Sequence, residues 1–161
     1  MNRQASLCIP LNMKQALCEL AFETSGKGFT NITDDLNAWI AKSAISTGIL
    51  AVHVKHTSCS LTINENADPR VLDDLAAWME AVVPQVAHGA LDGSDSLRRY
   101  RHDDEGPDDM PAHIRSALTS QTLSLSVVDG ELLLGIWQAV YLWEHRARPQ
   151  RRRLAAHLIG E

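Results

Sequence analysis

The sequence predicts one α+β domain, residues 1–161, with about three helices and a mixed, mostly antiparallel sheet of roughly six or seven strands. Two patterns support this class. Apolar residues recur at helical spacing in three segments, and runs rich in β-branched residues alternate with turn residues that favour hairpins. A third observation supports a single domain, because 161 residues with 45% hydrophobic content can bury one core but hardly two.

The N-terminal third is expected to hold two short strands and a helix. Residues 6–11 and 17–23 have the composition of strands around a turn, although residues 14–20 would also pass as helical. Thr33 offers a helix cap before two acidic residues, and apolar residues then recur at helical spacing up to Gly48. These apolar residues are Leu36, Trp39, Ile40 and Ala44.

Residues 49–63 predict one long strand, because β-branched residues are frequent and apolar side chains alternate. The apolar positions change from even to odd numbers along it, so we expect a bulge or bend near residues 57–60. A second helix follows, with Asp68 as N-cap, Pro69 at its first position and an end before Pro84. Its apolar stripe consists of Val71, Leu72, Leu75, Trp78, Met79 and Val82.

The C-terminal half is expected to hold a loop, a short helix and three strands. Residues 87–98 are rich in Gly, Ser and Asp and predict the loop. The third helix begins near Asp109. Residues 123–128 and 132–143 flank a turn at residues 129–130 and predict a hairpin, and residues 153–159 predict a last strand.

Charge and cysteine content limit the compartment and the partners. The formal net charge of -5 argues against nucleic-acid or anionic-membrane binding, since both rely on a basic surface. The cysteines Cys8, Cys18 and Cys59 form no CxxC pair and are odd in number, which favours a reducing cytoplasm over a disulfide framework. The sequence contains no signal-peptide pattern and no apolar run long enough to span a membrane. We therefore expect a cytoplasmic protein.

The segment from residue 100 to residue 113 is the clearest candidate site. It holds two histidines and five carboxylates, and it has no apolar period. Histidine with Asp or Glu is a ligand set for a borderline divalent metal, and the carboxylates are also candidate acids and bases. The alternative interpretation is a solvated acidic loop before a capped helix. A second charged cluster, of arginines, lies near the C-terminus of the sequence. These arginines could neutralise the acids or flank the same site.

Three histidines are the candidate metal ligands. His56 lies at the expected bend of the long strand, His102 just before the acidic run, and His113 in the first turn of the third helix. Three imidazoles with a fourth position open to water or substrate would form a catalytic metal site, and zinc suits such ligands. The competing explanation is that they are hydrogen-bonded structural histidines.

Four further polar residues are candidates for catalysis and phosphate binding. Glu65 in a polar turn and Asp109 beside His113 could orient a metal-bound histidine or move a proton, although capping is the simpler role for Asp109. Gln138 is expected mid-strand, where a polar amide needs a partner or a ligand. Arg152 is expected to face away from its two arginine neighbours and could bind phosphate, although an exposed solubilising arginine is commoner.

Five blocks of the sequence resemble, in order and spacing, the signature blocks of the YjbQ-like family. They are residues 56–58, 63–69, 108–114, 134–138 and 144–146. The resemblance spans nearly the whole chain, and it favours the metal site over structural histidines. Cys59 departs from the alanine expected in the first block, and Ile136 and Ala139 replace the more usual Thr and Gly. These departures remove no polar group of the candidate site.

The resemblance implies a cytoplasmic α+β homotrimer with weak, secondary thiamine-phosphate synthase activity. In that reaction the nitrogen of a thiazole phosphate displaces pyrophosphate from a hydroxymethylpyrimidine carrier, so the partner would be a small phosphorylated molecule. A metal-dependent hydrolase using the same ligands is an alternative, and so is a trimer that binds a metal or small anion without turnover. The trimer also agrees with residues 132–143, which are apolar on both faces of the expected strand.

Overall fold

The computed structural model describes residues 12–89, 94 and 96–161. Its three helices are α1 (Thr33–Lys42), α2 (Pro69–Val82) and α3 (Asp109–Leu118). The strands of the described residues are β1 (Lys14–Thr24), β2 (Gly28–Asn31), β3 (Gly48–Val54), β4 (Cys59–Glu65), β5 (Ala87–Gly89), β6 (Leu97–Arg99), β7 (Thr122–Val128), β8 (Glu131–Leu132), β9 (Gln138–Glu144) and β10 (Gln150–Gly160).

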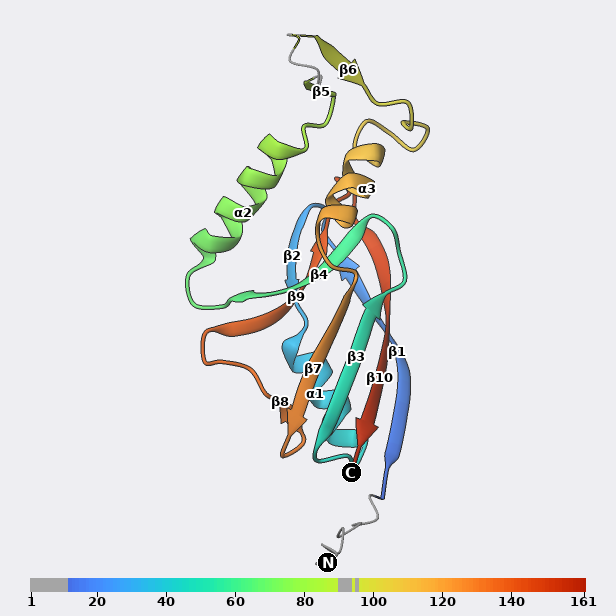
Figure 1. Ribbon diagram of the computed structural model, residues 1–161, viewed down its shortest axis with the longest axis vertical. Coiled ribbons are helices and arrows are strands. Elements are labelled where there is room, and N and C mark those ends of the chain that lie inside the picture. The colour runs from blue at the N-terminus through green and yellow to red at the C-terminus, as the bar shows by residue number, and fades with distance from the viewer. Residues whose placement is uncertain (1–11, 90–93, 95) are drawn as a thin grey trace, which may run out of the picture.

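The strands form three antiparallel sheets (Figure 1). The largest has the order β1-β10-β3-β7-β8, the second has the order β2-β9-β4, and β5 pairs with β6 in a small ribbon. Figure 1 shows α1 behind the five-stranded sheet, and α2 and the β5–β6 ribbon at the upper end of the molecule. The α+β class with three helices is confirmed, although the described residues form more strands than expected.

The single strand expected over residues 49–63 is wrong. The chain leaves β3 after Val54 and enters β4 at Cys59, and these two strands belong to different sheets. The apolar positions change from even to odd residue numbers at this crossing. The change allows Val52 of β3 and Leu61 of β4 to enter the same core. Residues 55–58 connect the two strands, and the backbone carbonyl of Thr57 in this connection contacts His113 of α3.

The hairpin expected between residues 123–128 and 132–143 is confirmed only as far as residue 132, where the strand after the expected turn ends. Strand β7 pairs only with the two-residue strand β8 on that side, and the chain then crosses to β9, which lies between β2 and β4. The physical reason is that β9 is apolar on both faces. Val140 and Leu142 enter the main core while Trp143 packs on the opposite side, so the strand needs cover on both sides.

The main core lies between the five-stranded sheet, α1 and the inner face of the three-stranded sheet. Ile32, Leu36 and Ile40 from α1 and the turn before it are fully buried there against Leu50 and Leu154. A second apolar cluster lies where α2 covers the other face of the three-stranded sheet. In that cluster Met79 and Val83 contact Trp143, whose ring stacks on Phe29 at 4.5 Å between ring centres.

The remaining expectations concern single elements. The first helix ends at Lys42, earlier than Gly48, and Ala44 follows with a positive φ of 56°. Helix α2 is confirmed, with the Asp68 side chain accepting from Arg70 N–H. The loop expected at residues 87–98 contains β5 and β6, and the strand expected at 6–11 lies outside the described residues. Among the described residues, no helix is both long and apolar enough to cross a bilayer.

Candidate metal centre

His102, Asp109 and His113 come together at the start of α3. Each offers one ligand atom, and these three atoms lie within 4.8 Å of one another. Asp109 and His113 are four residues apart on α3 and therefore lie one turn apart on the same helix face. His102 approaches from the loop that precedes the helix. Its Nε2 lies 3.3 Å from Asp109 Oδ2, and His113 Nε2 lies 3.5 Å from Asp109 Oδ1.

The Asp109 carboxylate is buried and only half satisfied. The residue is 1% exposed, and its Oδ1 accepts a hydrogen bond of 2.6 Å from Arg146 Nη1. Its Oδ2 is buried without a hydrogen-bond partner, although His102 lies beside it. A buried carboxylate oxygen without a partner is costly, and a cation bound at this oxygen would remove that cost. The donor set therefore fits a metal ion held by two imidazoles and one carboxylate.

The tautomer of His113 also suits a metal ligand. Its Nδ1 lies 3.0 Å from the carbonyl oxygen of Thr57, which can only accept, so Nδ1 carries the proton. The lone pair of Nε2 then faces the Asp109 carboxylate. Two electron-rich atoms facing each other repel unless a cation lies between them, and a carbonyl that orients a histidine in this way is a common feature of metal sites.

Arg146 organises the acidic segment around this centre. Its guanidinium donates to Asp109, to Asp108 Oδ2 at 3.2 Å and to Glu105 Oε2 at 3.1 Å, and Nη2 donates to the Glu105 carbonyl at 2.8 Å. Burial raises the pKa of Asp108, but the hydrogen bond from Ala147 N–H and the charge of Arg146 outweigh it and leave that pKa below its ordinary value. One arginine of the C-terminal cluster thus neutralises the acids while holding Asp109 in place.

His56 lies beside the centre but is not part of the group of three. The adjacent carbonyl of Thr57 contacts His113, so the backbone at residues 56–57 borders the site. The ring of His56 turns toward Ser58, whose N–H and Oγ lie 3.2 and 3.0 Å from His56 Nδ1. The structure therefore brings together two of the three histidines expected to share a metal, with Asp109 as the third member of the group.

Arg152 faces away from its neighbours, as expected, but into the protein rather than toward solvent. It is 2% exposed, and its Nε and Nη2 donate to the two oxygens of Glu144 at 2.6 and 2.7 Å. Burial lowers its pKa, but the hydrogen bonds to Glu144 outweigh that effect and raise it. Nη2 also donates to Ser58 Oγ at 3.3 Å. The expected surface phosphate ligand is thus engaged in a buried ion pair.

Comparison with known proteins identifies the family of the chain. The family model described as UPF0047 protein YjbQ-like matches residues 18–161. The chain belongs to the YjbQ-like family. A UPF0047 protein of Synechocystis is 49% identical over 142 residues, covering 88% of this chain and 90% of the relative. UPF0047 protein YjbQ of Escherichia coli O157:H7 is 37% identical over 143 residues, covering 88% of this chain and 96% of the relative.

Solved structures of YjbQ-like proteins share the fold. A protein of the YjbQ/UPF0047 family from Clostridium acetobutylicum matches with a TM-score of 0.74 and 30% identity, covering 88% of this chain and 98% of the other. A YbjQ-like protein of unknown function from Sulfolobus solfataricus matches with a TM-score of 0.79 and 20% identity, covering 93% of this chain and 100% of the other. The second likeness concerns the fold alone.

Glu65 and Gln138 lie away from the candidate metal centre of this YjbQ-like chain. They pair with each other at one end of the β4–β9 ladder, whereas Cys59 and Glu144 pair at the end near α3. Gln138 is the exposed first residue of β9, not a mid-strand residue, and its Oε1 accepts from Gly135 N–H at 2.8 Å. Within one chain, neither side chain joins the three residues at the start of α3.

His145 is a buried residue whose importance the sequence did not reveal. It is 1% exposed, its Nε2 lies 2.9 Å from Ser60 Oγ, and its ring packs on Trp143. Burial, followed by the charges of Arg115 and Arg152, lowers the pKa of His145 to about 3. The imidazole is therefore neutral in the folded chain at neutral pH. Its position directly after the apolar run of residues 139–143 and Glu144 is a sequence signal that is compatible with this burial.

Because His145 is buried and neutral, we expect the free energy of unfolding to fall in acid. The folded pKa of about 3 lies below the ordinary value of 6.5, so between these values only the unfolded chain binds the proton. The free energy of unfolding is unaffected above pH 6.5 and should fall by about 1.4 kcal/mol per pH unit below it. Urea unfolding of the wild type and of His145→Gln at pH 7, 5 and 4 measures this term. Equal pH slopes for the two proteins would contradict it, and His53→Gln at an exposed histidine is the control.

Proposed function

We propose that this chain binds one divalent metal ion, zinc, through His102, Asp109 and His113. The observation that supports this proposal is the buried Asp109 Oδ2, which has no hydrogen-bond partner and lies beside two imidazole nitrogens. Two histidines and one carboxylate form a donor set that zinc accepts. Asp109 thereby takes the ligand position that the sequence suggested for His56. Asp109 is held from behind by Arg146 and His113 by the Thr57 carbonyl, which would keep both ligands oriented.

We propose that the centre acts on a small phosphorylated molecule, with thiamine-phosphate synthase as the reaction. The thiazole-phosphate nitrogen would form a bond to the methylene carbon of hydroxymethylpyrimidine diphosphate, and the carbon–oxygen bond would break so that diphosphate leaves with the electron pair. Bound zinc would supply positive charge for the leaving diphosphate. The chain itself would orient the two substrates, which is the main requirement of such a displacement. The family resemblance supports this assignment.

A metal-dependent hydrolase is the second candidate. The observation in its favour is that His102 and His113 remain partly open to solvent, with side chains 51% and 31% exposed. A metal held there would keep positions for water, which hydrolysis requires. The buried Asp109 would remain a ligand in either reaction, so its geometry does not distinguish the two candidates.

Metal content and turnover of the same preparation test the proposal. Protein purified without chelator should retain about one zinc ion per chain by elemental analysis. The zinc-loaded chain should form thiamine phosphate from the two substrates, and removing the zinc should stop the reaction. Zinc retention with hydrolysis of a phosphate ester but no synthesis would favour the hydrolase. Retention without any turnover would favour a binding protein, and absence of zinc affinity would contradict the metal centre itself.

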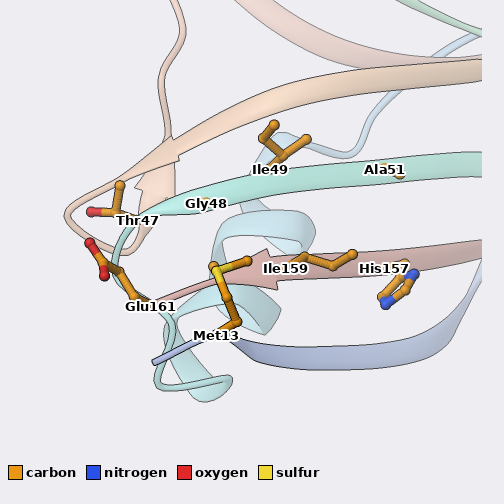
Figure 2. A pocket seen from close by; sticks show the side chains of 9 residues that line it. Met13, Thr47, Gly48, Ile49, Ala51, His157, Ile159 and Glu161 are labelled. Carbon is orange, nitrogen blue, oxygen red and sulfur yellow. The ribbon is translucent and has the colours of Figure 1, made fainter. Parts of the chain in front are cut away.

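We propose further that the chain assembles as a homotrimer. Apolar side chains are exposed on the outer face of the five-stranded sheet, where Leu17, Ile49 and Ile159 are 74%, 58% and 41% exposed. A hollow of about 470 Å³ lies on that face. Figure 2 shows the side chains of Met13, Ile49 and Ile159 around it. A second exposed apolar region lies in the crossing between β8 and β9, where Ile136 and Trp137 point outward. Surfaces of this kind favour burial by other copies of the chain.

Light scattering at micromolar concentration tests the assembly. The mass should correspond to about three chains, because cyclic assembly would cover two different apolar regions on each copy. A stable monomer would contradict the proposal. A dimer would also contradict it, since it would indicate one self-complementary patch rather than two.

A further inference from the structure

Four polar side chains form a continuous hydrogen-bonded path from the protein interior to the edge of the candidate metal centre. Glu144 accepts from Arg152 at 2.6 and 2.7 Å, and Arg152 Nη2 lies 3.3 Å from Ser58 Oγ. Ser58 Oγ lies 3.0 Å from His56 Nδ1. Glu144, Arg152 and Ser58 are all at most 2% exposed, whereas His56 reaches the surface. Such a buried hydrogen-bonded path restricts the orientation and the proton position of the His56 ring at its outer end.

The direction of each hydrogen bond along this path is fixed by chemistry. A guanidinium can only donate, so Ser58 Oγ accepts from Arg152. The Ser58 hydroxyl proton is then free to go to its other neighbour, His56 Nδ1. The Ser58 backbone N–H, which can only donate, also points to Nδ1, at 3.2 Å. Nδ1 therefore accepts from two donors, and the ring proton of neutral His56 must lie on Nε2.

This tautomer is the opposite of that found in His113. His113 carries its proton on Nδ1 because Thr57 O accepts there, and its Nε2 lone pair is available to a metal. His56 has no lone pair left on Nε2 and cannot ligate through that atom. Partial withdrawal of the ring from water, followed by the charge of Arg152, lowers the pKa of His56 and favours the neutral form. The two histidines that border the centre thus differ in chemistry, since His113 offers a lone pair at Nε2 and His56 offers an N–H there.

We propose that His56 is a hydrogen-bond donor, through Nε2–H, to an anionic oxygen of a phosphorylated molecule held at the centre, and that Ser58 and Arg152 are its positioning residues. This inference rests on the proposed metal centre. The geometry supports a donor because both partners of Nδ1 are donors and because the backbone of residues 56–57 borders His113. A phosphate oxygen is the acceptor class that matches a neutral imidazole N–H beside a buried arginine and a metal ion. Arg152 would thus serve phosphate recognition through Ser58 rather than by contact.

Nitrogen-15 NMR of the histidine rings tests the tautomer directly. In the chelator-treated chain, His56 should show protonated Nε2 and unprotonated Nδ1, and His113 the reverse, with His56→Ala and His113→Ala spectra providing the assignments. Adding zinc should shift His113 Nε2 strongly and leave His56 Nε2 protonated. Loss of the Nε2 proton of His56 on zinc binding would show that it is a ligand and would overturn the inference. If zinc shifts neither ring, the proposed metal centre fails, while the spectrum of the zinc-free chain still decides the tautomer.

Binding measurements with zinc and inorganic phosphate separate the two roles. His56→Ala should leave zinc affinity within about threefold of wild type, whereas His113→Ala should weaken it by more than about a hundredfold. On the zinc-loaded chain, His56→Ala should weaken phosphate binding by about tenfold, the effect of one hydrogen bond to a charged group. His53→Ala, at an exposed histidine on β3, is the matched control and should change neither. Unchanged phosphate affinity in zinc-loaded His56→Ala would overturn the donor role.

The positioning role of Ser58 has its own test. Ser58→Ala removes the hydroxyl that links Arg152 to His56, and it should increase the population of the other His56 tautomer and weaken phosphate binding without loss of zinc. Ser58→Thr restores a hydroxyl and should rescue both properties. A structural role alone would lower stability in Ser58→Ala but leave the tautomer unchanged, and that result would overturn the assignment.

Discussion

His113→Ala is expected to abolish zinc retention and, with it, any thiamine-phosphate synthase turnover. The substitution leaves His102 and Asp109 as the only members of the group of three, and it leaves the Thr57 carbonyl without the ring that it orients. A metal that loses one of three protein ligands is held far more weakly, so zinc content should fall below about a tenth of an ion per chain. The fold should persist, because His113 is partly exposed and the buried residues of α3 are unchanged.

Elemental analysis, turnover and circular dichroism of the same preparation measure these effects together. His53→Ala is the matched control, since His53 is an exposed histidine of β3 and does not belong to the group of three at the start of α3. A variant at His113 that is folded and still binds zinc like the wild type would contradict the proposed ligand set. A variant that loses zinc but keeps full turnover would separate the metal from the activity and contradict the proposed enzyme.

Local sequence patterns were enough to predict the helices and the fold class. The helical spacing around Leu36 and Ile40, and the Asp68 cap before Pro69, depend on residues close together in the chain. The strand partners depend on distant residues. An apolar run such as residues 132–143 is compatible with a hairpin, but burial on both faces of β9 requires β2 and β4 as neighbours. The spacing of apolar residues along the sequence does not show which strands pair with each other.

The candidate site was partly predictable for the same reason. Residues 100–113 stood out because their polar groups follow no apolar period, and that segment supplies all three members of the group. The partner that holds Asp109 is Arg146, 37 residues further on, and no local pattern pairs residues so far apart in the chain. The tautomer of His56 was equally hidden, because it depends on how Ser58 and Arg152 meet in the folded chain.

Alternation along β10 correctly placed Arg152 opposite its neighbours but could not show that Glu144 lies behind it. Glu144 is 1% exposed, and its Oε1 also accepts from the backbone N–H groups of His145 and Arg146 at 3.0 and 2.9 Å. Its Oε2 accepts from Thr24 Oγ1 at 3.2 Å. Because all of these groups donate, both oxygens of Glu144 accept hydrogen bonds, and the site suits a fully charged carboxylate.

Glu144→Gln is therefore expected to lower the free energy of unfolding by about 3–5 kcal/mol, the cost of leaving one buried charge without its partner. The amide is nearly the same size, but its NH₂ would face donors whichever way it points, and Arg152 would keep an uncompensated charge in the interior. Such a loss is a large fraction of the 5–15 kcal/mol, roughly, that stabilises a typical domain. Urea unfolding of the zinc-free proteins measures it without a contribution from metal binding.

Glu23→Gln is the matched control for that substitution, because it removes a carboxylate that pairs with the neighbouring arginine of β10 in an exposed setting. Glu23 pairs with Arg151 at 3.3 Å, and the two side chains are 75% and 64% exposed. Solvent screens such a pair, so Glu23→Gln should change the free energy of unfolding by less than about 1 kcal/mol. Equal small losses for the two variants would show that Arg152 finds another partner or reaches water. The contrast between them thus measures how firmly the Glu144–Arg152 pair fixes the path that ends at His56.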